Sequence, residues 1–134
     1  MNPTSEKSDY LLLFRGMDWY QDLSPEEMQK TMTEWMTWFN RLVAEGRCKG
    51  GQSLGIEGKI VSGKLRNVTD GPYAEVKEAV AGYFLLSVKD MEEALEIAKE
   101  CPTLGFGTTV EVRPLMVRCH ASELAAMEPA VAHA

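Results

Sequence analysis

The chain has 134 residues, of which 45% are hydrophobic and 25% charged, the ordinary balance of a single soluble globular domain. Its 20 acidic and 14 basic residues give a formal net charge of −6, and no cluster of Lys and Arg occurs. This charge distribution excludes the basic footprint that nucleic-acid binding requires. No apolar run approaches the roughly 20 residues of a membrane-spanning helix, and residues 1–9 are too polar for a signal peptide, so we expect a cytoplasmic protein with no membrane partner.

The three cysteines, Cys48, Cys101 and Cys119, are odd in number and widely spaced. This arrangement fits neither a secreted disulfide framework nor a paired-cysteine metal site, so we expect reduced thiols and no metal. The glycines at residues 50–55 lack the spacing and the flanking strand and helix of a dinucleotide-binding loop. We therefore expect no cofactor.

The first expected element is a strand at residues 10–14, whose unbroken apolar sequence indicates burial on both faces. A long helix should follow at residues 25–45, because Ser24 and Glu27 form a capping box and Gly46 provides a natural end. Its apolar side chains form one stripe, which we expect to face the core: Met28, Met32, Trp35, Met36, Phe39, Leu42 and Val43.

Trp38 lies at the margin of this stripe. Packing at the edge of the core is the main interpretation, and contact with a partner or a pocket is the alternative.

A hairpin is expected where residues 56–61 and 65–69 pair across Ser62-Gly63-Lys64. The strongest strand signal covers residues 79–88, which are apolar on both faces. A second helix should start at Asp90, with Glu93 completing its cap, and stop at Pro102. We expect its inward side chains to be Met91, Ala94, Leu95, Ala98 and Cys101. A last strand at residues 108–118 and a tail complete the chain.

This order predicts an α+β, ferredoxin-like βαββαβ domain at residues 1–120 with an antiparallel sheet and an inserted hairpin, followed by a C-terminal tail at residues 121–134. Both helices should cover one face of the sheet. The other face, with Tyr83 and Leu85, would leave an apolar surface too large for a monomer. We therefore expect a symmetric homodimer whose sheets pack face to face, with a pocket between the sheets or at the sheet edge.

The most specific segment runs from Val68 to Glu78, Val-Thr-Asp-Gly-Pro-Tyr-Ala-Glu-Val-Lys-Glu, and precedes the strongest strand. It resembles the VTDGPFAE-x-KE signature of the DGPF group within the YCII-related family, with Tyr73 where that family usually has Phe. The Glu92-Glu93-Ala94 helix, Cys101-Pro102 and the closing strand at residues 110–114 fit the same pattern, so the resemblance covers about residues 8–118.

The resemblance implies the fold of the dimeric α+β barrels, a superfamily that includes muconolactone isomerases and small-molecule monooxygenases. The genes of this family often lie beside those of alternative sigma factors in bacteria, which suggests a link to stress regulation. In the wider family a His and an Asp are the suspected catalytic pair. This chain departs from that pattern, because His120 and His133 are its only histidines and both lie near the C-terminus.

Asp70 is the candidate catalytic residue, and two interpretations stay open. It can act as a turn former before Gly71-Pro72, where Gly71 supplies a conformation that other residues reach only under strain. Alternatively, it is a partly buried carboxylate at the mouth of the pocket and serves as a general base.

Arg113, Tyr83, Tyr73 and Glu75 are the candidate substrate-binding residues. Arg113 shares a strand face with Glu111, so it can hold a substrate carboxylate or form a structural ion pair. Glu75 lies in a run of charges that is also typical of solvated ion pairs, and the tyrosines are also typical of core packing.

Two classes of function remain from the sequence. One is a cofactor-independent enzyme that performs acid–base chemistry on a small organic molecule at Asp70. The other is a non-catalytic small-molecule sensor or a protein-interaction module linked to sigma-factor or stress regulation.

Overall fold

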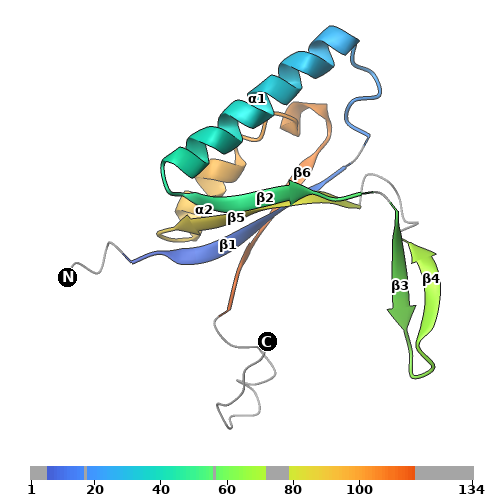
Figure 1. Cartoon of the computed structure of the whole chain (residues 1–134). Helices are drawn as coiled ribbons and strands as arrows, with labels where there is room; N and C mark the ends of the chain where they lie inside the picture. The colour runs from blue at the N-terminus through green and yellow to red at the C-terminus, as the bar shows by residue number, and fades with distance from the viewer. Residues whose placement is uncertain (1–5, 17, 56, 72–78, 117–134) are drawn as a thin grey trace.

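Four strands form the central antiparallel sheet in the order β2-β5-β1-β6 (Figure 1). The structure is a computed structural model, and it describes residues 6–16, 18–55, 57–71 and 79–116. The strands are β1 (Ser8–Arg15), β2 (Cys48–Ser53), β5 (Val80–Val88) and β6 (Thr109–Pro114), with helices α1 (Pro25–Ala44) after β1 and α2 (Met91–Ala98) after β5. This arrangement confirms the expected α+β, ferredoxin-like fold.

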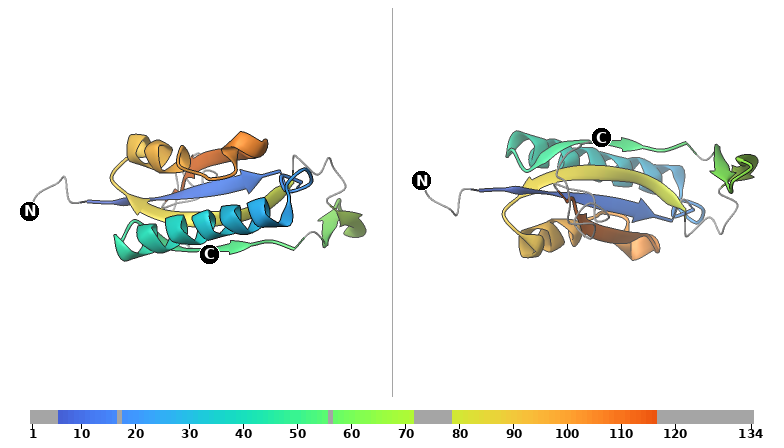
Figure 2. Two further views of the ribbon diagram at one scale, coloured as in Figure 1. Left: turned by 90° about the horizontal axis from the view of Figure 1, so that it is seen from above. Right: turned by 90° about the horizontal axis from the view of Figure 1, so that it is seen from below.

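Both helices cover the same face of the sheet, and the view from the other side shows the strands without a helix over them (Figure 2). In β1, Leu12 and Phe14 point to the helices and are buried, whereas Leu11 and Leu13 are only half-buried. The expectation that this strand is buried on both faces is therefore wrong within a single chain. We call the side without helices the open face.

Helix α1 begins as expected. Ser24 accepts a hydrogen bond from the Glu27 backbone N–H at 3.1 Å, and the Glu27 carboxylate accepts one from the Ser24 N–H at 2.9 Å. The expected inward stripe is confirmed in part, because Leu42 is buried and Trp35 and Phe39 pack against the core, but Thr31 and Trp38 are also buried and lie outside that stripe.

Three members of that stripe, Met32, Met36 and Val43, are instead 43%, 52% and 44% exposed. The apolar surface of α1 is wider than its contact with the sheet, so the methionines lie beside that contact.

Trp38 belongs to the core and is only 4% exposed, so the alternative that it faces a partner is wrong. Its ring contacts Trp35 and Phe84, with centroids 5.2 and 5.0 Å away. Its indole N–H donates to the Glu100 carboxylate at 3.0 Å, which satisfies the one polar group that burial would otherwise isolate.

Helix α2 buries Ala94, Ile97 and Ala98, whereas Leu95, which was expected inside, is 40% exposed. Asp90 caps the helix by accepting from the Glu93 N–H at 3.0 Å. The Glu93 carboxylate accepts from the Lys89 N–H at 2.8 Å instead of completing the box at Asp90.

The 3-10 helix η3 (Leu104–Phe106) leads from α2 to β6. Strand β6 ends at Pro114, four residues before the expected end at 118, because proline has no N–H for the ladder. The tail at residues 121–134 lies outside the described residues.

The expected hairpin is present and forms its own two-stranded sheet of β3 (Gly58–Ser62) and β4 (Asn67–Gly71). Its turn includes Gly63 and Arg66, both at positive φ, so it is one residue longer than the expected three-residue turn. The hairpin lies beyond one end of the main sheet and extends away from the helices (Figure 1).

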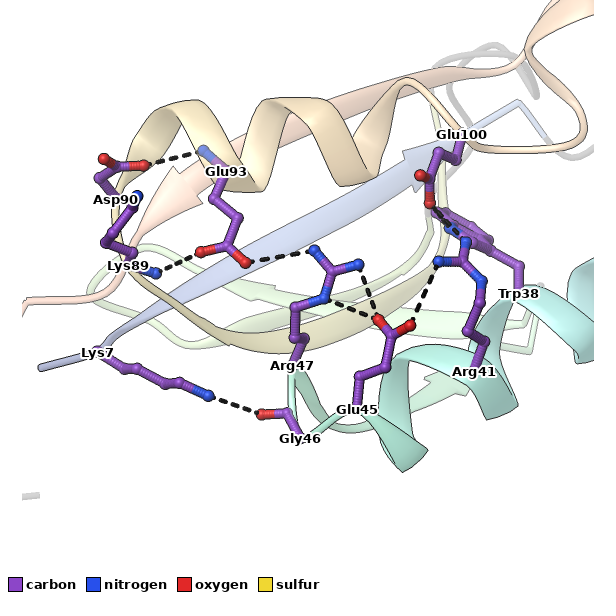
Figure 3. A network of polar contacts seen from close by, with 10 residues as sticks. All are labelled: Lys7, Trp38, Arg41, Glu45, Gly46, Arg47, Lys89, Asp90, Glu93 and Glu100. Carbon is purple, nitrogen blue, oxygen red and sulfur yellow. Dashed lines mark hydrogen bonds and ion pairs between the residues drawn. The ribbon is translucent and has the colours of Figure 1, made fainter. Parts of the chain in front are cut away.

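An ion-pair network joins the two helices (Figure 3). Arg47 contacts Glu93 at 3.3 Å and Glu45 at 2.8 Å, and Arg41 contacts Glu100 at 2.8 Å. Burial lowers the pKa of Arg47, but its hydrogen bonds to Glu45 and Glu93 outweigh this effect and the net pKa is raised. The network thus links the end of α1 to α2 and to Glu100, which follows α2.

Candidate functional site

A cavity of about 410 Å³ lies between α1 and the sheet, within the size range of small-molecule sites. We call it the aromatic cavity. Its walls come from β1, α1, β2, β5 and the segments that follow β1 and α2. The lining residues are Phe14, Gly16, Trp19, Met32, Trp35, Met36, Phe39, Gly51, Gln52, Ser53, Ala81, Gly82, Tyr83, Phe84, Thr103 and Thr108.

Two glycines allow the strands at the floor of the cavity to approach each other. A Cβ at Gly51 would lie 2.6 Å from the Tyr83 carbonyl oxygen, and a Cβ at Gly82 would lie 2.8 Å from the Gln52 carbonyl oxygen. Both distances are too short for any other residue type. The glycines therefore allow β2 to pair closely with β5 at the floor of the cavity.

Aromatic rings form the inner wall of the cavity. Phe14 lies 4.8 Å from Trp35 and 4.9 Å from Phe84 between ring centroids, and both pairs meet edge to face. Phe39 lies 5.0 Å from Phe84. Such contacts fix the ring planes, so the wall has a set shape that suits another flat ring.

The outer side of the cavity is formed by Met32 and Met36 of α1 and by Trp19, which stacks on Phe106 at 6.3 Å. Methionine side chains adapt to irregular shapes because they are unbranched and polarizable. The cavity thus combines a rigid aromatic wall with an adaptable rim.

Two buried threonines add polar groups to this apolar lining. The Thr103 hydroxyl pairs with the Cys101 thiol at 3.4 Å. Thr108 is 5% exposed, and its hydroxyl oxygen has no hydrogen-bond partner in the described part of the chain. An unpaired buried hydroxyl costs about 1–3 kcal/mol of stability.

Among the described lining residues there is no Asp, Glu, Lys, Arg or His. The one titratable member is Tyr83, and strand alternation directs its side chain to the face opposite Phe84. The described lining therefore suits a neutral, largely apolar molecule and supplies no general base.

Asp70, the expected catalytic residue, lies in β4 outside the cavity lining. Its side chain is 61% exposed and forms an ion pair with Lys59, its cross-strand neighbour. It lies within a strand and not at a turn. Gly71 does not adopt a positive φ, and its role is steric because a Cβ there would collide with the Ile60 side chain. Pro72, Tyr73 and Glu75 lie outside the described residues.

Arg113 lies on the open face of β6, with Glu111 two positions before it. The two side chains contact each other at 3.6 Å, and Glu111 also accepts from Arg15 of β1 at 2.8 Å. The hydrogen bond from Arg15 lowers the pKa of the Glu111 carboxyl. The structure thus places Arg113 in the ion-pair arrangement anticipated as its structural role, and it does not bring Arg113, Asp70 and Tyr83 together around one cavity.

Cys48 and Cys101 are free thiols, and burial raises the pKa of each. Both therefore stay protonated at neutral pH and are poor nucleophiles. In the portion of the chain that the structure describes, no three His, Cys, Asp or Glu side chains gather as a metal site.

Trp19, Met32, Met36 and Thr108 form much of the site, and sequence reasoning did not assign any of them to a pocket. A usable signal existed in α1, where the methionines lie on one side of a stripe wider than a helix normally buries. No local signal marks Thr108, because its burial depends on the whole fold.

The comparisons with known proteins identify the family of the chain. A family model described as YCII-related domain matches residues 10–117. Over 49 residues the chain is 41% identical to "Uncharacterized protein R00369" of Rhizobium meliloti (strain 1021). This match covers 36% of the chain and 40% of that protein, so it spans well under two thirds of the length of the relative.

Proposed function

The chain belongs to the YCII-related family, and from this membership and the geometry of the aromatic cavity we propose that it binds a small aromatic molecule with one polar substituent. The observation that carries the proposal is the cavity of about 410 Å³, which is lined by aromatic rings and by Thr108, whose hydroxyl has no hydrogen-bond partner among the described residues. The ring of the ligand packs against Trp35 and Phe84, and its polar group hydrogen-bonds the threonine.

Binding without chemistry is the function that this lining supports best. Its described residues offer apolar contact and hydroxyl groups but no charged side chain. We therefore favour a small-molecule sensor over an acid–base enzyme. Catalysis through Asp70 stays a prediction, since its ion pair with Lys59 lies on the separate hairpin.

The binding experiment uses 2-naphthol as the probe and isothermal titration calorimetry as the readout. A ligand of this size should bind once per chain with a dissociation constant between about 10 μM and 1 mM. Met36→Trp should abolish binding because the larger side chain fills the rim of the cavity. Val43→Trp is the matched control, since Val43 lies two turns along the same helix face and does not line the cavity.

A second comparison separates the ring contacts from the polar contact. Thr108→Val should weaken 2-naphthol by about tenfold, the value of one net hydrogen bond, and should leave the binding of naphthalene unchanged. Equal binding of 2-naphthol to the wild type and to Met36→Trp would contradict the proposed site.

We also propose that two copies pair through the open face of the sheet. Leu11, Leu13, Tyr83 and Leu85 are only half-buried there, beside the polar group of Arg15 and Glu111. A second copy of the same face would cover these apolar side chains by a two-fold axis. Sedimentation equilibrium should give a dimer mass at micromolar concentration, and a strictly monomeric protein would contradict the pairing.

Among the described segments, no helix is both long and apolar enough to cross a membrane. The free thiols Cys48 and Cys101 support our proposal that the protein works in the reducing cytoplasm. No described feature indicates a particular regulatory protein partner.

A further inference from the structure

Within the part of the chain that the structure describes, the hairpin β3–β4 lacks the support that a small sheet normally needs. Its strands are hydrogen-bonded to each other and to no strand of the main sheet. Apart from Gly71 all its strand residues are exposed, including Val61 and Val68, whose exposed fractions are 64% and 61%. An isolated two-stranded hairpin is at best marginally stable in water, so these valines require a covering surface.

The two faces of the hairpin differ. Val61 and Val68 are direct cross-strand neighbours, and the Lys59–Asp70 ion pair shares their face because it lies two positions along each strand. On the opposite face, the Ile60 side chain already lies over Gly71. Val61 and Val68 are more exposed than Ile60, at 64% and 61% against 46%, so the valine face presents the larger uncovered apolar surface among the described strand residues.

The position of the hairpin indicates what covers it. The hairpin lies past the end of the main sheet and extends to the side away from the helices, which is the side of the open face (Figures 1 and 2). A body that packs against the open face would lie alongside the hairpin. One body packed on the open face would therefore cover the hairpin as well.

The charge of the hairpin supports a second copy as this occupant. Residues 58–71 carry three basic side chains and one acidic side chain, a formal charge of +2. The whole chain has −6, so the rest of it carries −8. A basic hairpin on an acidic chain is attracted to the acidic part of another copy. In a two-fold dimer both hairpins make this contact.

We propose that β3–β4 is a dimerisation arm whose Val61–Val68 face packs against the body of a second copy. The inference rests on the proposed pairing of the open faces and extends the interface beyond the sheet. Each chain supplies one arm and receives the other, so the dimer is clamped at both ends.

The test measures the dimer dissociation constant of the full chain by sedimentation velocity. Val61→Thr combined with Val68→Thr keeps the β-branched shape that the hairpin needs and removes the apolar contact. Four methyl groups per dimer become hydroxyls, so the dissociation constant should rise on the order of 100-fold. Val43→Thr, on the exposed side of α1, is the matched control and should leave it unchanged.

Hydrogen exchange on the same samples reports the hairpin directly. The amides of β3 and β4 should be protected at concentrations well above the dissociation constant and should exchange rapidly after dilution to the monomer. A dimer with an unprotected hairpin and no response to the double variant would overturn the arm but leave the open-face pairing intact. A protein that stays monomeric at millimolar concentration would overturn both, whereas 2-naphthol binding tests the cavity independently of either.

Discussion

Thr108 should lower the free energy of unfolding relative to a valine at the same position. The two side chains have nearly the same shape, and the threonine hydroxyl is buried without a partner in the described chain. Removing an unpaired buried hydroxyl avoids part of a desolvation cost of about 1–3 kcal/mol. We therefore expect Thr108→Val to raise the free energy of unfolding by about 1 kcal/mol, and Tm by roughly 3–5 °C.

The assay is urea denaturation followed by tryptophan fluorescence, with Thr103→Val as the matched control. Thr103 is also buried and also lines the cavity, but its hydroxyl pairs with the Cys101 thiol. The control should lower the free energy of unfolding by about 0.5 kcal/mol, because it loses a weak hydrogen bond. If both variants were destabilised alike, the Thr108 hydroxyl would have a partner and the polar half of the site would be refuted.

Three further predictions concern titratable side chains. Because Arg15 lowers the pKa of Glu111, the stability from this ion pair is present above pH about 4.5 and is lost as the pH falls through the pKa of the folded state. Arg15→Ala should return the pKa of Glu111 to normal in an NMR titration. An unchanged pKa would show that the contact between Arg15 and Glu111 is absent. Cys48 and Cys101 should resist iodoacetamide at pH 8 in the folded protein and react in urea, as peptide mapping would detect; rapid native labelling would contradict their burial. Asp70→Asn should change stability by less than about 1 kcal/mol in thermal denaturation, since its ion pair is exposed, and a loss above about 2 kcal/mol would restore the turn-forming role.

The local patterns of the sequence were sufficient to predict the elements in their order, except for the strand Cys48–Ser53. Capping at Ser24 and Asp90 located both helix starts, and the run of residues 79–88, apolar on both faces, located one of the two central strands. These signals lie within a few residues of the structure that they specify. The ferredoxin-like arrangement followed because few topologies satisfy that order.

The orientation of α1 could not be predicted in the same way. Its apolar residues cover more of the helix than the sheet can contact, so periodicity alone gave no reason to choose Trp38 over Met36 as the buried residue. Met32 and Met36 instead line the cavity, together with glycines of β2 and β5 that bring those strands close to each other. The cavity thus depends on the packing of β1, α1, β2 and β5 together.

The strand Cys48–Ser53 was missed for a related reason. It contains Gly50 and Gly51, which have little intrinsic tendency to form strands, and it is held by pairing with β5. The expected site was also misplaced, since residues 68–71 of the signature segment lie in an exposed strand of the hairpin.

The most direct test of the central claim is an NMR measurement of contacts between 2-naphthol and the protein. The bound probe should give nuclear Overhauser effects to the ring protons of Trp35 and Phe84 and to the methyl protons of Met36, since these side chains line the aromatic cavity. Contacts confined to the open face, for example to Leu85, or no contacts at millimolar concentration would show that the cavity is not the binding site.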